Sequence, residues 1–313
     1  MISTMFKQFD NLFTMMQVLN TEEACINHFR AARWPNGVVC PHCGAVKVYN
    51  LNNQTHKCAE CKIKFSIRHN TIFTDSKISL QKWFMAIYLI TSHKKGISSC
   101  QLARDIKVTQ KTAWFMLHRI RNATDAPESS EMLNGTVEVD ETYVGGKEKN
   151  KHQHKRTKGT QGAGSHKTKT VIFGMVKRNG ELRLKKIPRT DSATVAPIIL
   201  SNVCPTSIVN TDEASAYNWV KGSYKHDVVA HNAGEYVRGE SYTNTIEGVF
   251  SHFKRAILGT YHHVSKKHID RYARMFSYRW NSRTMGEGQR LNMLLTKTVG
   301  RRLKYDQLIG KIA

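Results

Sequence analysis

The spacing of apolar residues predicts helices in the first 124 residues and again near the C-terminus. Within residues 78–122, Trp83, Ile87 and Ile90 recur close to a period of 3.6 residues, which is typical of an amphipathic helix. Gly96 interrupts this period and predicts a break. The other helices expected outside the central region cover residues 20–33, 98–106, 109–121 and 268–312.

Between residues 136 and 258, short β-type runs alternate with helical stretches. Strands followed by a mixture of strand and helix predict an α+β domain with a central sheet covered by helices. Residues 147–169 contain almost no apolar residue and predict a mobile basic loop. The expected strands cover 136–143, 170–177, 182–187, 207–210 and 227–230, and the expected helices cover 192–201, 213–220 and 241–258.

The charge of the chain indicates the class of molecule that it binds. Its 313 residues, enough for two or three domains, include 48 Lys and Arg against 24 Asp and Glu, a formal net charge of +24. Such a chain is attracted to a polyanion, and nucleic acid is favoured over a membrane surface because no basic amphipathic helix with a strong apolar face stands out. With no signal-peptide pattern and no stretch of ~18 apolar residues, we expect a cytoplasmic, nucleoid-associated protein with no membrane partner.

Four of the seven cysteines form a CxxC…CxxC pattern, with Cys40 and Cys43 in one pair and Cys58 and Cys61 in the other. Two such pairs on adjacent turns supply the four thiolates of a tetrahedral zinc ribbon. Because four thiolates leave no coordination position for water, we expect a structural Zn²⁺. A redox pair of the thioredoxin type would need a single CxxC near a βαβ pattern instead.

The spacing of apolar residues within 96–121 is typical of a helix-turn-helix. Apolar positions fall on one side of each short helix, which leaves Gln110, Lys111, Trp114 and Arg121 facing outward, suited to a DNA groove and its phosphates. An ordinary helical hairpin would show the same pattern. The basic composition favours DNA.

Three carboxylates, at Asp140, Asp212 and Glu247, stand in settings that suit a shared metal site. Asp140 lies in an expected strand, Asp212 follows another, and Glu247 lies on the expected helix 241–258. Carboxylate oxygens select Mg²⁺ or Mn²⁺ rather than zinc. Two such ions close together can assist phosphodiester cleavage.

The two aspartates are each followed by a glutamate, Glu141 and Glu213, so the sequence leaves each ligand ambiguous by one residue. Strand alternation gives a preference between Asp140 and Glu141. Glu138 and Asp140 share a polar face, whereas Glu141 shares the face of valines, and this favours Asp140.

Glu247 and Lys254 fall nearly in line beside an apolar stripe when successive residues turn by about 100°. A carboxylate and an ammonium at the border of a buried stripe suit an active site in which Lys254 holds a phosphate as a point charge. A surface helix with solvated charges would look the same, so the helix alone leaves both interpretations open. The stripe consists of Ile246, Phe250, Phe253 and Ile257.

Several stretches around these residues resemble the DDE transposases of bacterial insertion sequences, in the group with an N-terminal zinc ribbon and an ISXO2-like catalytic domain. An Asn-x-x-Glu run with Lys seven residues after the glutamate is the most specific match, and the likeness extends from the ribbon to about residue 283. The matching stretches are VEVDETYVGG at 137–146, NTDEASAY at 210–217, HNAGEYV at 231–237, TNTIEGVFSHFKR at 243–255, GTYH at 259–262 and YRWNSR at 278–283.

The resemblance implies an RNase H-like catalytic domain in which Asp140, Asp212 and Glu247 bind two metal ions, Mg²⁺ or Mn²⁺. Lys254 matches the family's basic residue after the glutamate. The implied reaction is hydrolysis at the ends of the element, followed by attack of the freed 3′-hydroxyls on target DNA. The implied partners are the double-stranded terminal repeats, the target DNA and further copies of the chain in a homo-oligomer.

We therefore predict a multidomain α+β protein in four parts. Residues 1–70 form an N-terminal helix and zinc ribbon, 75–123 a helix-turn-helix-like region, 133–290 an RNase H-like mixed sheet with flanking helices, and 291–313 a C-terminal tail. The predicted function is that of a DNA transposase. Two alternatives remain open at this point: a metal-dependent nuclease or resolvase without strand transfer, and a non-enzymatic DNA-binding regulator.

Overall fold

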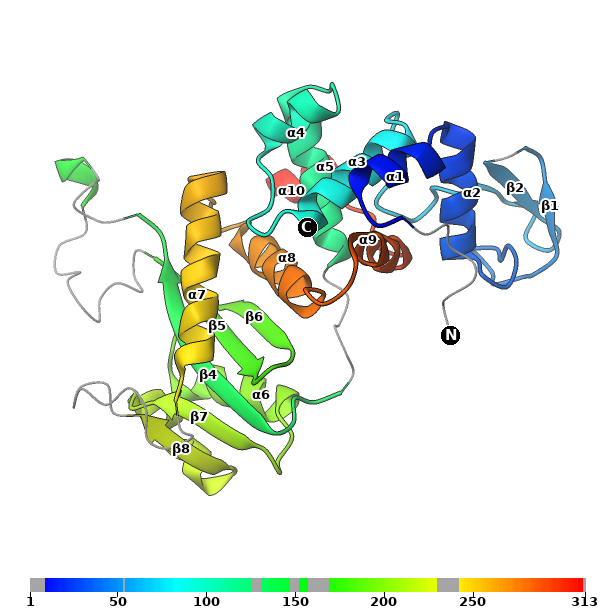
Figure 1. Cartoon of the computed structure of the whole chain (residues 1–313). Helices are drawn as coiled ribbons and strands as arrows, with labels where there is room; N and C mark the ends of the chain where they lie inside the picture. The colour runs from blue at the N-terminus through cyan, green and yellow to red at the C-terminus, as the bar shows by residue number, and fades with distance from the viewer. Residues whose placement is uncertain are drawn as a thin grey trace. The chain divides into compact units, whose positions relative to one another are not determined.

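The computed structural model of the chain describes residues 9–52, 54–124, 131–146, 152–156, 169–229 and 242–311. It divides into two compact units. The first unit combines Met1–Ala126 with Thr284–Ala313, and the second consists of Pro127–Arg283 (Figure 1). No helix among the described residues is long and apolar enough to cross a membrane.

The first unit contains a small antiparallel sheet and a group of helices. The sheet has the order β1-β2-β3, as expected for a ribbon of two hairpins. A serine or threonine side chain caps helices α2 to α5 at their N-termini, which satisfies backbone donors that have no partner within the helix. The elements are β1 (Val48–Asn50), β2 (Thr55–Cys58), β3 (Lys64–Ser66), α1 (Leu12–Val18), α2 (Glu22–Arg33), α3 (Leu80–Ser92), α4 (Ser99–Asp105), α5 (Gln110–Ala123), α9 (Glu287–Thr296) and α10 (Tyr305–Ile309).

Aromatic side chains form the core of the helical part of this unit. The ring of Phe73 lies 5.0 Å from that of Phe29 and 5.2 Å from that of Trp83, centroid to centroid, and all three side chains are buried. Such edge-to-face pairs add to the stabilisation from burial. The core therefore links α2, α3 and the segment that follows the ribbon.

The C-terminal residues belong to this first unit. Helix α9 lies against α2 and α3, with Leu291, Leu294 and Leu295 fully buried. Asn292 Oδ1 on α9 accepts a hydrogen bond of 2.7 Å from His28 Nε2 on α2. We expected the catalytic domain to end at residue 290 and residues 291–313 to form a separate tail. The structure instead groups the residues from Thr284 onward with the N-terminal helices. Local sequence cannot indicate a contact between segments more than 250 residues apart.

The second unit is built on a five-stranded sheet of order β6-β5-β4-β7-β8. The pairs β4–β5 and β5–β6 are antiparallel, whereas β4–β7 and β7–β8 are parallel. The predicted mixed sheet with flanking helices is thereby confirmed. Its strands are β4 (Thr136–Val144), β5 (Thr170–Lys177), β6 (Leu182–Ile187), β7 (Ile208–Asp212) and β8 (Lys225–Val229).

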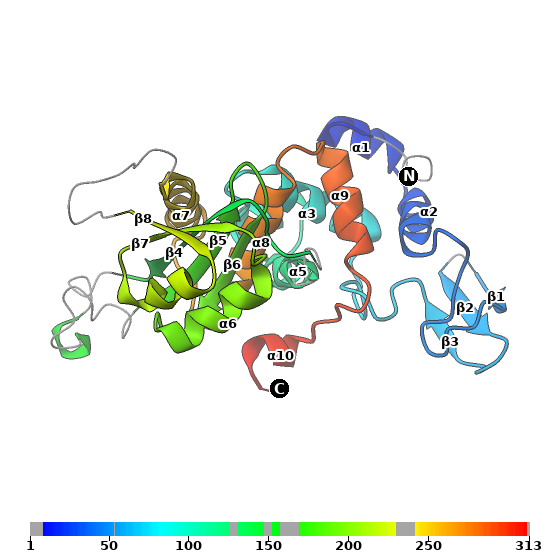
Figure 2. The ribbon, with the colours of Figure 1, turned by 90° about the horizontal axis from the view of Figure 1, so that it is seen from below.

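Helices cover both faces of this sheet. On one face, Val137, Val139 and Phe173 pack with residues of α6 (Ser192–Asn202) and of the 3₁₀ helix η4 (Ser215–Gly222). On the other, Ile172 and Leu184 pack with α7 (Asn244–Ala256) and α8 (Ile269–Asn281). Figure 2 shows α6 on one side of the sheet and α7 on the other. The alternation of strand side chains sends odd-numbered β4 residues to the first face and even-numbered ones to the second.

Helix α7 approaches the sheet closely at Gly174 on β5. A Cβ atom at this position would lie 2.8 Å from Cδ1 of Ile246, 2.9 Å from Cζ of Phe250 and 3.0 Å from Cδ2 of Leu184. The three side chains are buried, so each can move only against its neighbours. Gly174 therefore allows α7 to lie directly on β5, beside the strand residue with which Gly174 is paired, Asp140.

We expect Gly174→Ala to lower the free energy of unfolding by about 1–3 kcal/mol, because the added methyl group overpacks the contact. The matched variant Gly248→Ala changes an α7 glycine with no atom near the Cβ position and should raise stability by roughly 0.5–1 kcal/mol, since alanine is the better helix former. Chemical denaturation of the two variants measures both effects. Equal changes in the two would contradict the close approach.

Candidate metal centres and nucleic-acid surface

The two CxxC turns have the same backbone geometry. The residue after each second cysteine adopts a left-handed conformation, with φ +78° at Gly44 and φ +60° at Lys62. In the first turn, the N–H of Gly44 donates to the carbonyl of Cys40 over 3.0 Å. Each turn thus brings its two thiols to the same side, although only the first uses the residue type that enters this conformation without cost.

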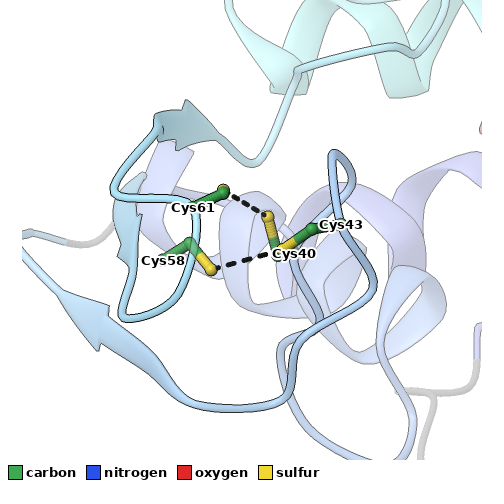
Figure 3. Close-up of side chains that lie close together, drawn as sticks. All are labelled: Cys40, Cys43, Cys58 and Cys61. Atoms are coloured by element: carbon green, nitrogen blue, oxygen red, sulfur yellow. Dashed lines mark hydrogen bonds between the residues drawn. The ribbon is translucent and has the colours of Figure 1, made fainter.

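The four sulfur atoms converge on one point (Figure 3). Those of Cys40 and Cys61 are 3.7 Å apart, those of Cys43 and Cys58 are 3.6 Å apart, and all four lie within 4.8 Å of one another. A tetrahedron with Zn–S bonds of ~2.3 Å has edges of about 3.8 Å, so the cluster has the size that a zinc ion requires. The separations are far longer than a disulfide bond of ~2.05 Å, and the four cysteines are free thiols.

Backbone donors favour the thiolate form of Cys58. Burial raises the pKa of this thiol, but hydrogen bonds from the N–H groups of Cys61 and Glu60, the latter 3.4 Å from the sulfur, and from the thiols of Cys43 and Cys61 together bring the pKa to about 7. In the same cluster, burial and the neighbouring thiols raise the pKa of Cys61 to about 12. The thiolate is the form that binds a metal. The four-cysteine site therefore fits the structural Zn²⁺ predicted from the sequence.

The sheet brings Asp140 and Asp212 to the same level on neighbouring strands. The parallel ladder pairs Thr136 with Ile208 and Glu138 with Asn210, an offset of 72 positions. The two aspartates are also 72 positions apart (212 − 140), so continuing the register by two residues places them opposite each other. Side chains at matching positions of adjacent strands point to the same face.

Helix α7 carries the third carboxylate to this face. Gly174, the β5 partner of Asp140, lies directly beneath Ile246, the residue before Glu247. Burial and the nearby carboxylates of Glu141, Asp212 and Glu247 raise the pKa of Asp140 well above its usual range. Asp212 and Glu247 therefore both lie near enough to Asp140 to act on it electrostatically.

A local donor holds one oxygen of each acid. The N–H of Glu141 donates to Asp140 Oδ1 over 2.7 Å, the N–H of Ala214 donates to Asp212 Oδ1 over 3.1 Å, and the hydroxyl of Thr243 donates to Glu247 Oε1 over 3.1 Å. Such contacts fix the orientation of a carboxylate.

Glu141, the alternative to Asp140, points to the opposite face of the sheet. Its Oε2 accepts a hydrogen bond of 2.6 Å from the hydroxyl of Tyr217, a buried residue of η4. Burial also raises the pKa of Glu141. Because Tyr217 and η4 lie on the face remote from α7, the geometry favours Asp140 over Glu141 as the partner of Glu247.

The acids are more widely spaced than the cysteines. Among the residues that the structure describes, only the four cysteines bring three or more ligand atoms of His, Cys, Asp or Glu within 4.8 Å of one another. Oxygen donors around a pair of ions ~3.5–4 Å apart must enclose a larger space than donors around one ion. Lys254 is exposed two turns after Glu247 on the same helix.

The two short helices expected at 98–106 and 109–121 are present as α4 and α5. Leu102, Ile106 and Ala113 are buried between them, and Lys107 turns the chain with a φ of +54°. Of the residues proposed to face DNA, Gln110 and Lys111 are exposed and Trp114 is partly exposed, with its ring 4.4 Å from that of His118.

Arg121 does not face outward as predicted. Its side chain is only 1% exposed, so this assignment to the DNA surface is wrong. The C-terminal segment packs against this end of α5, where Arg119 Nε donates to the carbonyl of Leu303 and Asn122 Nδ2 to that of Arg301. The helical pattern of α5 alone could not indicate that a distant segment covers its second half.

Glu138 is a residue of this region that the sequence analysis did not assign to a role. It is fully buried and forms a salt bridge with Arg178. The sequence does indicate, by strand alternation, that the side chain of Glu138 lies on the same face of the strand as that of Asp140. Two further regions of interest, the matching stretch 231–237 and most of the basic loop 147–169, lie outside the described residues.

Comparison with known families places these sites in context. A family model described as an ISXO2-like transposase domain matches residues 132–281, and a transposase zinc-ribbon domain matches residues 20–64. An uncharacterized protein in transposable element ISH50 of Halobacterium salinarum is 31% identical over 271 residues, which cover 83% of this chain and 90% of the relative. An uncharacterized transposase-like protein of Haemophilus influenzae is 31% identical over 97 residues, which cover 31% of this chain and 77% of the relative.

The chain belongs to the ISXO2-like transposases that carry an N-terminal zinc ribbon. The ribbon match contains all four clustered cysteines, and the transposase-domain match contains Asp140, Asp212, Glu247 and Lys254. Membership in this family indicates a protein that acts on DNA.

We expect Cys43→Ser to lose the bound zinc and to unfold the ribbon, because a small module of this kind depends on the metal for its folding. Zinc content measured by mass spectrometry should fall from about one ion per chain to near zero. Cys204→Ser, at a cysteine outside the cluster, is the matched control and should keep its zinc. Unchanged zinc in the Cys43 variant would exclude the four-cysteine site.

Proposed function

We propose that this chain is a DNA transposase that cleaves the ends of an insertion sequence and joins them to target DNA at a metal centre formed by Asp140, Asp212 and Glu247. The observation that carries the proposal is the parallel β4–β7 register, whose last pair lies two residues before each aspartate, together with the close approach of α7 to Gly174 on β5. The transposase family of the chain supports the same reaction class.

The proposed chemistry has two steps at the same site. Water first attacks a phosphodiester at the end of the element, and the broken P–O bond leaves a free 3′-hydroxyl. This hydroxyl then attacks a phosphodiester of the target, where a new O–P bond forms as the target's own P–O3′ bond breaks. The first step converts one phosphodiester and water into a 3′-hydroxyl and a 5′-phosphate. The second exchanges one phosphodiester for another and releases a 3′-hydroxyl on the target, and neither step needs a covalent bond to the protein.

In this proposal, Asp140, Asp212 and Glu247 hold two divalent ions, Mg²⁺ or Mn²⁺. Bound ions of this kind supply Lewis acidity to the phosphate and to the attacking and leaving oxygens. The protein contributes the orientation of its carboxylates, because one oxygen of each is held by a local donor. The negative charge that accumulates around Asp140 attracts divalent cations to the site.

Lys254 is proposed to bind a phosphate of the DNA next to the metal centre. It lies seven residues after Glu247 on α7, about 10 Å along the helix axis at 1.5 Å per residue. An exposed ammonium at this distance acts as a point charge on the DNA backbone.

Recognition of DNA is proposed to involve the helix-turn-helix. Gln110, Lys111 and Trp114 lie on the first two turns of α5, the part of a recognition helix that contacts base edges and phosphates. Further copies of the chain are proposed to assemble on DNA, since two ends of an element are joined together in one reaction.

We expect Asp212→Asn to abolish cleavage of a labelled duplex taken from the DNA that flanks the gene, while DNA binding is preserved. The variant removes a proposed metal ligand and makes the site less negative. Glu213→Gln, at the exposed neighbouring residue, is the matched control and should cleave within a few-fold of the wild type. Full cleavage by the Asp212 variant would remove this residue from the site.

The same assay, with a plasmid target added, separates the proposed function from its alternatives. Joined products from the wild type support a transposase. Cleavage without joining across Mg²⁺ and Mn²⁺ would contradict strand transfer and favour a nuclease, and binding without either reaction would favour a regulator.

We expect Lys111→Ala to weaken DNA binding and to reduce the slope of log Kd against log salt by about 0.9, the value for one lost phosphate contact. Lys185→Ala changes an exposed lysine on β6 and serves as the control, with no change in slope expected. Fluorescence anisotropy at several salt concentrations measures both. An unchanged slope in the Lys111 variant would remove this residue from the DNA surface.

A further inference from the structure

Glu138 is a completely buried carboxylate two residues before Asp140 on the same face of β4. A buried charge is stable only where other groups pair with it and donate hydrogen bonds to it. Oε1 of Glu138 accepts from Arg178 Nε over 2.9 Å and from the Thr245 hydroxyl over 2.8 Å. Oε2 accepts from the backbone N–H of Ile246 over 3.0 Å.

Two of these three donors belong to the first turn of α7. Thr245 and Ile246 directly precede Glu247, so Glu138 binds the helix one residue before the proposed ligand. The first N–H groups of a helix have no partner within it and carry a partial positive charge, which makes a carboxylate a favourable partner. Glu138 therefore ties the start of α7 to the strand that carries Asp140.

Arg178 extends this anchor to the segment before the helix. Its Nη2 donates to the carbonyl of Tyr242 over 3.0 Å, and its guanidinium lies 3.5 Å from the centre of the Tyr242 ring. The same carbonyl accepts a hydrogen bond of 3.3 Å from Asn210 Nδ2 on β7. Residues of β4 and β7, together with Arg178 directly after β5, thus hold the chain where it enters α7.

Glu138 itself is not placed to bind a metal ion. Both of its oxygens accept hydrogen bonds and its side chain is 0% exposed, whereas Asp140 is partly exposed. Glu138 and Asp140 therefore lie on the same face of the strand but in different environments. One is paired within the protein, and the other lies at the surface of the proposed metal centre.

We propose that Glu138 is a positioning residue that sets the place and rotation of α7, and so brings Glu247 to Asp140 and Asp212. This inference rests on the proposed metal site. Ile246 and Glu247 are consecutive, so fixing the N–H of the first restricts the direction in which the second side chain leaves the helix. Residues that orient metal ligands in this way change metal affinity by about 10–100-fold when they are replaced.

The test uses the zinc-loaded full chain and three variants. Glu138→Gln removes the charge, and Thr245→Val removes one donor while keeping the salt bridge with Arg178, so it remains informative should the first variant fail to fold. Ser277→Ala is the matched control, because buried Ser277 on α8 accepts the N–H of Leu184 on β6 and also joins a helix to the sheet, away from α7.

Two readouts are measured on each variant: hydrogen exchange at residues 243–250, and Mn²⁺ binding by electron paramagnetic resonance. We expect Glu138→Gln to accelerate exchange at the start of α7 and to weaken Mn²⁺ binding by about 10–100-fold. Thr245→Val should change both in the same direction by smaller factors. Ser277→Ala should leave both within about two-fold of the wild type, as expected for a change remote from these ligands.

Unchanged exchange and unchanged Mn²⁺ affinity in the Glu138 and Thr245 variants would overturn the inference. Equal losses in Ser277→Ala would overturn it as well, because they would reflect general destabilisation. Failure of the proposed metal site has a different signature: the wild type would then bind Mn²⁺ no better than Asp212→Asn. The exchange data would still decide whether Glu138 holds the start of α7.

Discussion

Parallel pairing between β4 and β7 is the constraint on which the arrangement of the three carboxylates depends. These strands are separated by more than 60 residues of sequence, yet their register places residues 72 positions apart at the same level. A shift of one residue would send one aspartate to the opposite face of the sheet. Because β4 is also the middle strand, its other neighbour β5 supports the helix that carries Glu247.

The approach of α7 depends in turn on small and buried groups rather than on the ligands themselves. Gly174 leaves room for Ile246 and Phe250 beside Asp140, and Glu138 binds the first turn of the helix. The apolar contact fixes how near the helix lies, and the buried carboxylate fixes where it begins. Together they place a glutamate from a distant part of the chain over two strand residues.

Charge is distributed unevenly in this protein. The chain as a whole carries +24, which attracts DNA and makes its binding dependent on salt. Around Asp140, in contrast, Glu141, Asp212 and Glu247 add negative charge to a partly buried position. In the proposed function, divalent cations would relieve this local repulsion and allow an anionic phosphate to approach it.

Much of this architecture could be predicted from local patterns. The strands at 170–177 and 182–187 were predicted with the observed bounds, since buried apolar runs between turn signals reflect sheet formation directly. The cysteine spacing likewise indicated the zinc cluster, and the resemblance to DDE transposases indicated the family.

Features that depend on distant contacts were not predictable in this way. The expected helix at 213–220 is a 3₁₀ helix over Ser215–Gly222, and α7 passes at Ile257 into a short π-helix, η6 (Ile257–Tyr261), instead of continuing as an α-helix. The burial of Arg121 and the packing of α9 both involve segments far apart in the sequence. The contacts of Glu138 with the start of α7 depend on the position of this helix, which no periodicity indicates.

The most direct test of the central claim is a crystal structure of the zinc-loaded protein soaked with Mn²⁺, with the ions located by anomalous scattering. The account predicts zinc at Cys40, Cys43, Cys58 and Cys61, and two manganese ions bonded to oxygens of Asp140, Asp212 and Glu247. Manganese bound only at other positions, with none in contact with Asp140, would contradict it.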